Sequence, residues 1–236
     1  GDVYKRQRNT AIYHLPGLFE FYELYRRFLP LFRTHREYFY DGCEIGSIYG
    51  APENCLWGGG RFSCGECDPQ AMMALLREYG ISARLTFSNS LLREEHLADE
   101  RCNALCRLLA ESGGPRNGVI VHSDLLAGYL KEHYPQLYLV SSTTKVLTEF
   151  EAFRQETDRE DFAYVVPDFR LNKAFAQLET LARAEKDKVE FLCNECCWTG
   201  CRDRKRCYEV VSRQNLGEDC PCLLYTSPSP RDTERS

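Results

Sequence analysis

The sequence predicts an α/β fold, a (β/α)8 TIM-type barrel that is truncated, with about six βα units present. Short apolar runs alternate with helical patterns along the chain, which is typical of parallel βα units. Most runs end in polar residues, and a barrel gathers its site at the carboxyl ends of its strands. Since a closed barrel needs eight units, the last two are expected to be missing. An open doubly wound sheet is the rival architecture.

The elements follow in order from the apolar spacing. An amphipathic helix opens the chain until Pro30 kinks or ends it, because large apolar residues recur at helical spacing: Leu18, Tyr22, Tyr25, Leu29 and Phe32. Strands are expected at six apolar runs: 38–45, 83–88, 118–122, 137–142, 163–168 and 188–193. Helical patterns occupy the other stretches: 69–79, 93–111, 124–133, 149–156, 172–185 and 203–214. Thr148 and Glu151 predict a capping box before the helix at 149–156.

The two ends differ in character from the rest of the chain. Residues 1–7 and 222–236 resemble translated sequencing-adapter read-through, and the tail combines Ser, Pro and charge without periodicity. A single, incomplete barrel domain is therefore expected over residues 8–221.

Composition narrows the class of protein. No apolar run is long enough to span a membrane, and no basic region followed by an apolar one opens the chain. Thirteen cysteines is an odd number, unlike a fully paired secreted scaffold. These features indicate a cytoplasmic protein. The net charge of -5 gives no reason to expect tight, nonspecific nucleic-acid binding.

Cysteines crowd the last third of the chain, four of them within residues 193–201. They follow a β-prone segment, so they are expected in the loop that leaves the last strand. Thiolates this dense in a reducing compartment are typical of metal sites, and zinc and iron–sulfur clusters both take four. Reduced thiols that pack as small apolar groups are the alternative. The preferred ligands are Cys193, Cys197, Cys201 and Cys207.

A second group of cysteines surrounds the long, glycine-containing connection after the first predicted strand: Cys43, Cys55, Cys64 and Cys67. These thiols could hold a second metal, or Cys43 could reach across the barrel mouth to the main cluster. A flexible loop with incidental thiols is the other interpretation. Cys102 and Cys106 lie one helical turn apart, as packing residues do.

The polar residues at the strand ends are candidate substrate-binding groups: Ser142, Thr143, Asp168 and Arg170. Lys145 could form a Schiff base or be a solvated surface lysine.

Other polar residues allow two interpretations each. His122 and Asp124 could transfer protons, although Ser123 and Asp124 equally predict a helix N-cap. Asp41 and Glu44 could provide acid–base chemistry at the first strand. The basic run 202–206 could steer an anionic substrate or RNA, or form a solvated first helical turn.

Three segments together resemble the collagenase-like (U-type) peptidase family: GVIVHSDLL at 118–126, LYLVSSTT at 137–144 and AYVVPDFRL at 163–171. The strand that carries the cysteines follows in the same order. The resemblance, to an uncharacterised branch, implies a barrel with a four-cysteine iron–sulfur site at its mouth, which in some members includes an early-strand cysteine such as Cys43. Neither an HExxH helix nor a GxSxG elbow occurs.

The sequence therefore supports three hypotheses. The first is an iron–sulfur barrel that supports hydroxylation or another modification of RNA or a metabolite. The second is a zinc-stapled binding barrel without catalysis. The third is a cofactor-free lyase or hydrolase that uses Lys145 or Asp168. The substrate, the electron donor and the oligomeric state do not follow from the sequence.

Overall fold

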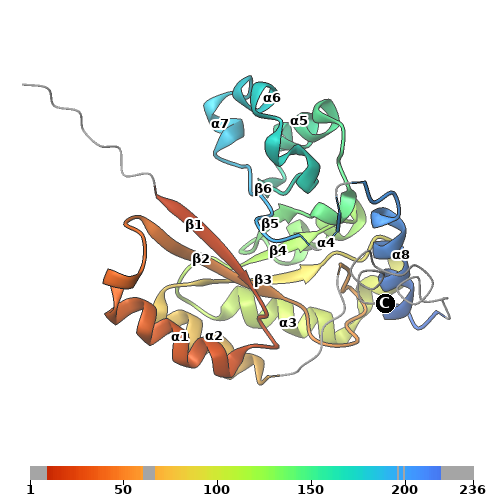
Figure 1. Ribbon diagram of the computed structural model, residues 1–236. Helices are drawn as coiled ribbons and strands as arrows, with labels where there is room; N and C mark the ends of the chain where they lie inside the picture. The colour runs from red at the N-terminus through yellow and green to blue at the C-terminus, as the bar shows by residue number, and fades with distance from the viewer. Residues whose placement is uncertain (1–9, 61–66, 196, 199, 219–236) are drawn as a thin grey trace, which may run out of the picture.

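The computed structural model describes residues 10–60, 67–195, 197–198 and 200–218. The sheet in this part of the chain has six parallel strands: β1 (Ala11–Pro16), β2 (Cys43–Gly50), β3 (Ser82–Phe87), β4 (Gly118–Val121), β5 (Tyr138–Ser141) and β6 (Phe162–Val165). Each strand pairs with the next along the chain, and the sheet curls into a half-barrel (Figure 1). A doubly wound sheet reverses its strand order, so the rival architecture is wrong for this sheet.

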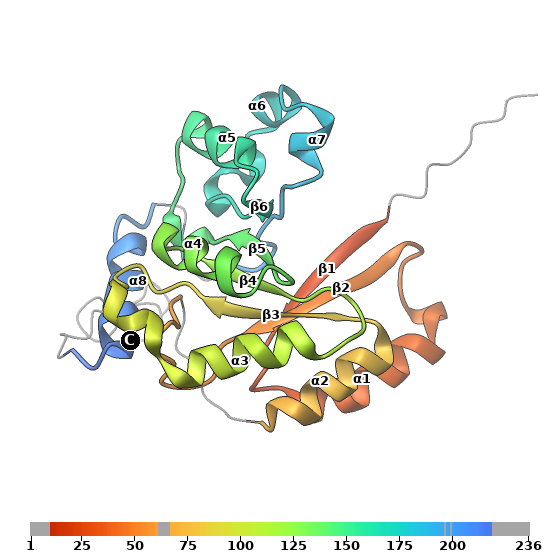
Figure 2. The ribbon, with the colours of Figure 1, turned by 180° about the vertical axis from the view of Figure 1, so that it is seen from behind.

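Helices alternate with these strands, as the sequence predicts. The α-helices are α1 (Tyr22–Thr34), α2 (Pro69–Tyr79), α3 (Glu100–Glu111), α4 (Asp124–His133), α5 (Phe150–Asp158), α6 (Phe175–Glu179), α7 (Arg183–Lys186) and α8 (Arg204–Asn215). Short 3-10 turns are η1 (Arg36–Tyr38), η2 (Glu94–Ala98), η3 (Thr143–Lys145) and η4 (Phe169–Lys173). In both views α1, α2 and α3 lie along one face of the sheet (Figures 1 and 2).

Several helix boundaries differ from the prediction. The pattern at 93–111 divides at Asp99, whose side chain caps α3 by accepting from the Cys102 backbone N–H. The pattern at 172–185 forms only the short α6 and α7. The predicted Thr148 capping box is wrong, because the N-cap residue of α5 is Glu149 and no side chain caps it. Pro30 does not end α1 but lies inside it.

The first strands differ most from the prediction. The edge strand β1 was not anticipated, and β2 runs over residues 43–50 instead of 38–45. Cys43 is therefore the first residue of β2 and lies at the amino end of the parallel sheet, opposite the barrel mouth. The expectation that Cys43 reaches across the mouth is therefore wrong. The predicted strand at 188–193 forms one parallel bridge, between Val165 and Val189.

The hydrophobic core lies between the helices and the convex face of the sheet. On β3, Ala83, Leu85 and Phe87 are fully buried in this core, with Met72 and Leu76 of α2 among their neighbours in the cluster. Their alternation with polar residues follows from the period of two in a strand. No helix in the described part of the chain is long and apolar enough to cross a membrane.

Candidate functional site at the barrel mouth

A buried carboxylate organises the carboxyl end of the half-barrel. Asp168 follows β6 and is completely buried. It accepts a hydrogen bond from the Arg170 backbone N–H and pairs with the Arg170 side chain, whose Nε lies 2.6 Å from Oδ1. The Nε of Arg204, from the first turn of α8, lies 3.2 Å from Oδ2. Two guanidinium groups therefore compensate one buried negative charge, as burial of a charge requires.

Arg204 connects the strand ends to the cysteine segment. Its side chain is only 1% exposed, and its Nη1 lies 2.6 Å from Oε2 of Glu195. Its Nη2 donates a hydrogen bond to Oγ1 of Thr143 at 3.3 Å. Burial lowers the pKa of Arg204, but Tyr208, Glu195 and Asp168 raise it by more, so the group is held charged. The interpretation of residues 202–206 as a solvated helical turn is wrong for Arg204.

Three of the four candidate substrate-binding residues, Thr143, Asp168 and Arg170, belong to this network. Thr143 accepts from Arg204 and donates to the Pro167 carbonyl, and Asp168 is enclosed by two arginines. Ser142 caps η3 by accepting from the Thr144 backbone N–H. The Arg170 side chain is 26% exposed, and it also donates to the Cys201 carbonyl at 3.4 Å. The structure thus brings Thr143, Asp168 and Arg170 together with the cysteine segment.

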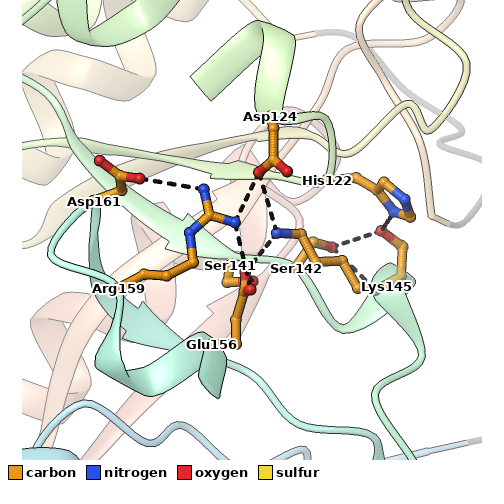
Figure 3. Close-up of polar contacts among 9 residues, drawn as sticks. His122, Asp124, Ser141, Ser142, Lys145, Glu156, Arg159 and Asp161 are labelled. Carbon is orange, nitrogen blue, oxygen red and sulfur yellow. Dashed lines mark hydrogen bonds and ion pairs between the residues drawn. The ribbon is translucent and has the colours of Figure 1, made fainter. Parts of the chain in front are cut away.

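A neutral histidine lies beside this network at the end of β4. His122 Nδ1 is 2.9 Å from Thr144 Oγ1, and Thr144 in turn donates to Ser142 Oγ (Figure 3). Burial lowers the pKa of His122 to about 4, with smaller contributions from Lys145 and Lys205. Asp124, its predicted partner in proton transfer, instead binds Arg159 at 2.8 Å. The N-cap interpretation is confirmed, because Ser123 accepts from the Leu126 backbone N–H.

Lys145 is neither a free amine nor a solvated surface group. Its side chain is 12% exposed, and Nζ lies 2.5 Å from Oε1 of Glu156, which also accepts from Ser141 Oγ at 2.6 Å (Figure 3). Asp124 lies 3.8 Å from the same Nζ. Two carboxylates contact Nζ, whereas a Schiff base requires an amine that is free to attack a carbonyl. The geometry therefore gives no support to the lyase hypothesis at Lys145.

The first three of the four predicted ligand cysteines precede α8, and Cys207 lies within it. Cys193 is exposed, and Cys197, Cys201 and Cys207 are partly buried. Burial raises the pKa of Cys207, and the neighbouring Cys201 adds to the effect, so these two thiols lie near each other. Among the described residues, which omit Cys64, Cys196, Cys220 and Cys222, no three metal-ligating side chains converge on one point. A closed four-thiolate site is therefore not preformed there.

The loop before α2 covers the mouth from the other side, which the sequence did not indicate. Asn89, directly after β3, donates from its side chain to the carbonyls of Leu56 and Ser212. Asn215 of α8 donates to the Gly58 carbonyl at 2.8 Å. Gly59 must be a glycine, because a Cβ there would lie 2.3 Å from the Ser88 backbone. Residues 51–60 are therefore packed, and the flexible-loop interpretation is wrong for them.

Three other cysteines belong to the core and not to the mouth. Cys55, Cys102 and Cys106 are each at most 1% exposed. The sulfur atoms of Cys55 and Cys102 lie 3.4 Å apart. The interpretation of Cys102 and Cys106 as packing residues is confirmed. Cys64, residues 1–7 and residues 222–236 lie outside the described residues.

Comparison with known proteins supports the fold. No family profile and no curated protein sequence matches the chain. Among solved structures, the U32 peptidase Mk0906 is similar, with a TM-score of 0.59 and 15% sequence identity over 100% of this chain and 88% of that chain. At this identity the likeness concerns the fold alone. The chain thus has the barrel-type α/β fold of a U32, or collagenase-like, peptidase, the family that its sequence resembles.

Proposed function

We propose that this barrel protein binds a thiolate-ligated metal centre, an iron–sulfur cluster or zinc, through the segment between Val189 and α8. Cys193, Cys197, Cys201 and Cys207 are the proposed ligands. The observation that carries the proposal is the anchoring of this segment at the mouth by Arg204, which bridges Asp168 of the barrel and Glu195 of the segment. A barrel holds its chemistry at this end of the sheet.

Anchoring the segment through buried charges costs desolvation free energy, and a loop with only a structural role could be anchored by apolar contacts instead. A buried ion pair seldom stabilises a protein more than apolar residues of the same volume would, because both charges lose their hydration. Buried pairs such as Asp168–Arg204–Glu195 do, however, fix one geometry. Here the contact between Arg204 and Glu195 joins the two ends of the stretch that carries Cys197 and Cys201. We infer that the network positions thiols and is not a source of stability.

The arrangement of the thiols fits a site that closes on metal binding. Metal binding and the folding of a ligand loop are coupled, so a loop need not hold its closed geometry without the metal. Outside its two undescribed residues, the segment 190–203 contains neither helix nor strand. The pair Cys201 and Cys207 would form the fixed half of the site, since Cys207 lies within α8. Cys193 and Cys197 would complete it.

The chemistry depends on which metal binds. Iron with an equal amount of sulfide would extend the proposal to hydroxylation or another modification of RNA or a metabolite, as the family resemblance implies. Arg170 is then the proposed contact to substrate, because it lies beside the Cys201 carbonyl and retains exposure. Zinc without sulfide would make the protein a zinc-stapled, non-catalytic barrel.

The test is the metal and acid-labile sulfide content of the anaerobically purified protein. We expect about one centre per chain in the wild type and loss of most metal in the Cys201→Ser and Cys207→Ser variants. Cys43→Ser is the matched control, since Cys43 is a partly exposed thiol at the opposite end of the sheet. A wild-type protein without metal, or equal loss in the control, would refute the proposal.

A further inference from the structure

Two buried cysteines from distant parts of the chain meet where the loop 51–60 packs against α3. Cys55 belongs to this loop, and Cys102 lies in the first turn of α3. Their side chains are 1% and 0% exposed, and their Sγ atoms lie 3.4 Å apart although 47 residues separate them in sequence. At this distance one thiol donates a hydrogen bond to the other, and the two sulfur atoms are close to bonding distance.

The geometry allows a disulfide with little movement. A disulfide holds its sulfur atoms about 2.05 Å apart, so the two Sγ atoms must approach each other by only about 1.4 Å. Cys102 is fixed on a helix, whereas the loop that carries Cys55 contains neither helix nor strand. The loop backbone can therefore supply the adjustment. Both residues are free thiols in this structure.

The surroundings make Cys55 the more reactive of the two sulfur atoms. The hydrogen bond from Cys102 lowers the pKa of Cys55, and burial opposes this change. The backbone N–H groups of Trp57 and Gly58 lower the pKa of Cys55 further, and so does Arg101. The same contact between the thiols raises the pKa of Cys102, and burial adds to that effect. Since the thiolate is the reactive form, Cys55 is the nucleophile of the pair and Cys102 is its proton donor.

The pair lies one residue below the surface in both segments. Asn54 precedes Cys55 and is exposed, and Arg101 precedes Cys102 and is exposed as well. At the surface, Arg101 Nη1 donates a hydrogen bond to the Glu53 carbonyl at 3.0 Å, which joins the loop to α3. Local opening of a surface loop costs less free energy than global unfolding. A small oxidant such as hydrogen peroxide can therefore reach the pair while the protein stays folded.

Cys106 provides a comparison within the same cluster. It lies one helical turn after Cys102 on α3 and is 0% exposed. Burial raises the pKa of Cys106, and the neighbouring Cys55 adds to the effect. Cys106 therefore remains a protonated thiol, and protonated thiols react slowly with oxidants. The cluster combines one reactive pair with one inert thiol.

We propose that Cys55 and Cys102 form a reversible disulfide when the protein meets hydrogen peroxide. The Cys55 thiolate attacks one peroxide oxygen, the O–O bond breaks, and the leaving hydroxide takes up a proton to become water. Cys102 then attacks the sulfenic acid on Cys55, so that the S–S bond forms, the S–O bond breaks and a second water leaves. The two thiols lose two electrons, which reduce the peroxide. A dithiol such as dithiothreitol reverses the reaction by exchange. The proposal does not depend on the metal centre.

The disulfide fastens the loop that covers one side of the mouth. This loop already contacts α8, because Asn215 donates to the Gly58 carbonyl. With Cys55 bonded to Cys102, the loop is held covalently by α3 as well. A cross-link between residues 47 apart in sequence restricts the unfolded chain. Oxidation should therefore raise the midpoint of thermal unfolding by about 10 °C.

Peptide mapping of the folded wild-type protein tests the pair directly. After treatment with peroxide and alkylation of the remaining thiols, a digest made without reductant should contain Cys55 linked to Cys102. Dithiothreitol should remove both the link and the gain in thermal midpoint. In Cys102→Ala, Cys55 should stop at the sulfenic acid, which dimedone traps. In Cys55→Ala, Cys102 should give little dimedone adduct.

The control is Cys106→Ala, which removes the third cysteine of the cluster and should form the same link at the wild-type rate. It also simplifies the assignment, because trypsin leaves Cys102 and Cys106 together in one peptide, 102–107. Since the link is located on the unmutated protein, a variant that fails to fold does not weaken the test. A wild type without this link after peroxide, a link from Cys55 to Cys106 instead, or equal dimedone adducts in the two single variants would overturn the proposal.

Discussion

The two faces of strand β3 show how one segment divides its work between packing and chemistry. Ala83, Leu85 and Phe87 face the helices and are completely buried among apolar side chains. Arg84 and Thr86, their neighbours in sequence, face the inside of the half-barrel. The convex face follows the rules of an ordinary core, whereas the concave face buries charge. The difference indicates that apolar packing stabilises the sheet from one face, whereas the other face must compensate each charge that it buries.

The largest effect should follow from breaking the charge balance inside the barrel. Replacing Glu190 with Leu leaves the buried Arg84 guanidinium without its partner and should lower the free energy of unfolding by about 3–5 kcal/mol. The double variant Glu190→Leu, Arg84→Met removes both charges and should recover most of this loss. Urea unfolding of the three proteins measures both values. A double variant as unstable as the single one would show that the charge pair is needed for folding.

A cavity on the helix-facing side should cost nearly as much. Leu85 is fully buried in the core, so Leu85→Ala should lower the free energy of unfolding by about 2–5 kcal/mol. The same change should leave the metal content per folded chain unchanged. If Leu85→Ala removed the metal without unfolding the protein, the core and the proposed metal site would not be independent.

Because His122 is buried as a neutral imidazole, the free energy of unfolding should fall when the pH is lowered below about 6.5. Its pKa in the folded protein is lowered to about 4, below the ordinary 6.5, mainly by burial. Its contribution to stability is therefore complete above pH 6.5 and is lost as the pH falls from 6.5 toward 4. Between about pH 7 and about pH 5 the loss should be on the order of 1–2 kcal/mol, and His122→Gln should remove it. Urea unfolding at the two pH values, compared between wild type and variant, decides this.

The smallest change in stability is expected at a polar atom of the concave face that lacks a hydrogen-bond partner among the described residues. Thr86 Oγ1 is buried without a hydrogen-bond partner among the described residues. Thr86→Val has nearly the same shape and removes an unpaired hydroxyl, so the free energy of unfolding should be unchanged or raised by about 1 kcal/mol. A clear destabilisation in thermal or urea unfolding would mean that this hydroxyl has a partner, such as a bound ligand.

Local signals explain which elements the sequence predicts well. The helices α2 and α4 begin where Asp68 and Ser123 cap them, and their predicted spans agree with the structure. The strand β1 was missed because its exposed edge residues show no clean alternation. Aromatic residues around Tyr38 and Tyr40 imitate a strand and displaced the predicted start of β2. Because the predicted strand begins five residues too early, it puts Cys43 near the carboxyl end of the strand, whereas Cys43 is the first residue of β2.

The site was harder to predict because its contacts join distant parts of the chain. Asp168 and Arg170 were identified from their place after a strand, which barrel topology makes informative. One interpretation of the sequence puts Arg204 in a solvated turn, although Arg204, Tyr208 and Ser212 recur at a spacing of four along α8 and are all buried. That spacing was the available signal. The contact between Cys55 and Cys102 leaves no local pattern.

The proposed metal site lies at the mouth of this half-barrel, on cysteine thiolates that Arg204 helps to position. The most direct measurement is the metal and sulfide content of the anaerobically purified wild type beside Cys201→Ser and Cys43→Ser. The account predicts about one centre per chain in the wild type and in Cys43→Ser, and little metal in Cys201→Ser. A wild-type protein that folds fully and contains neither iron nor zinc would contradict it.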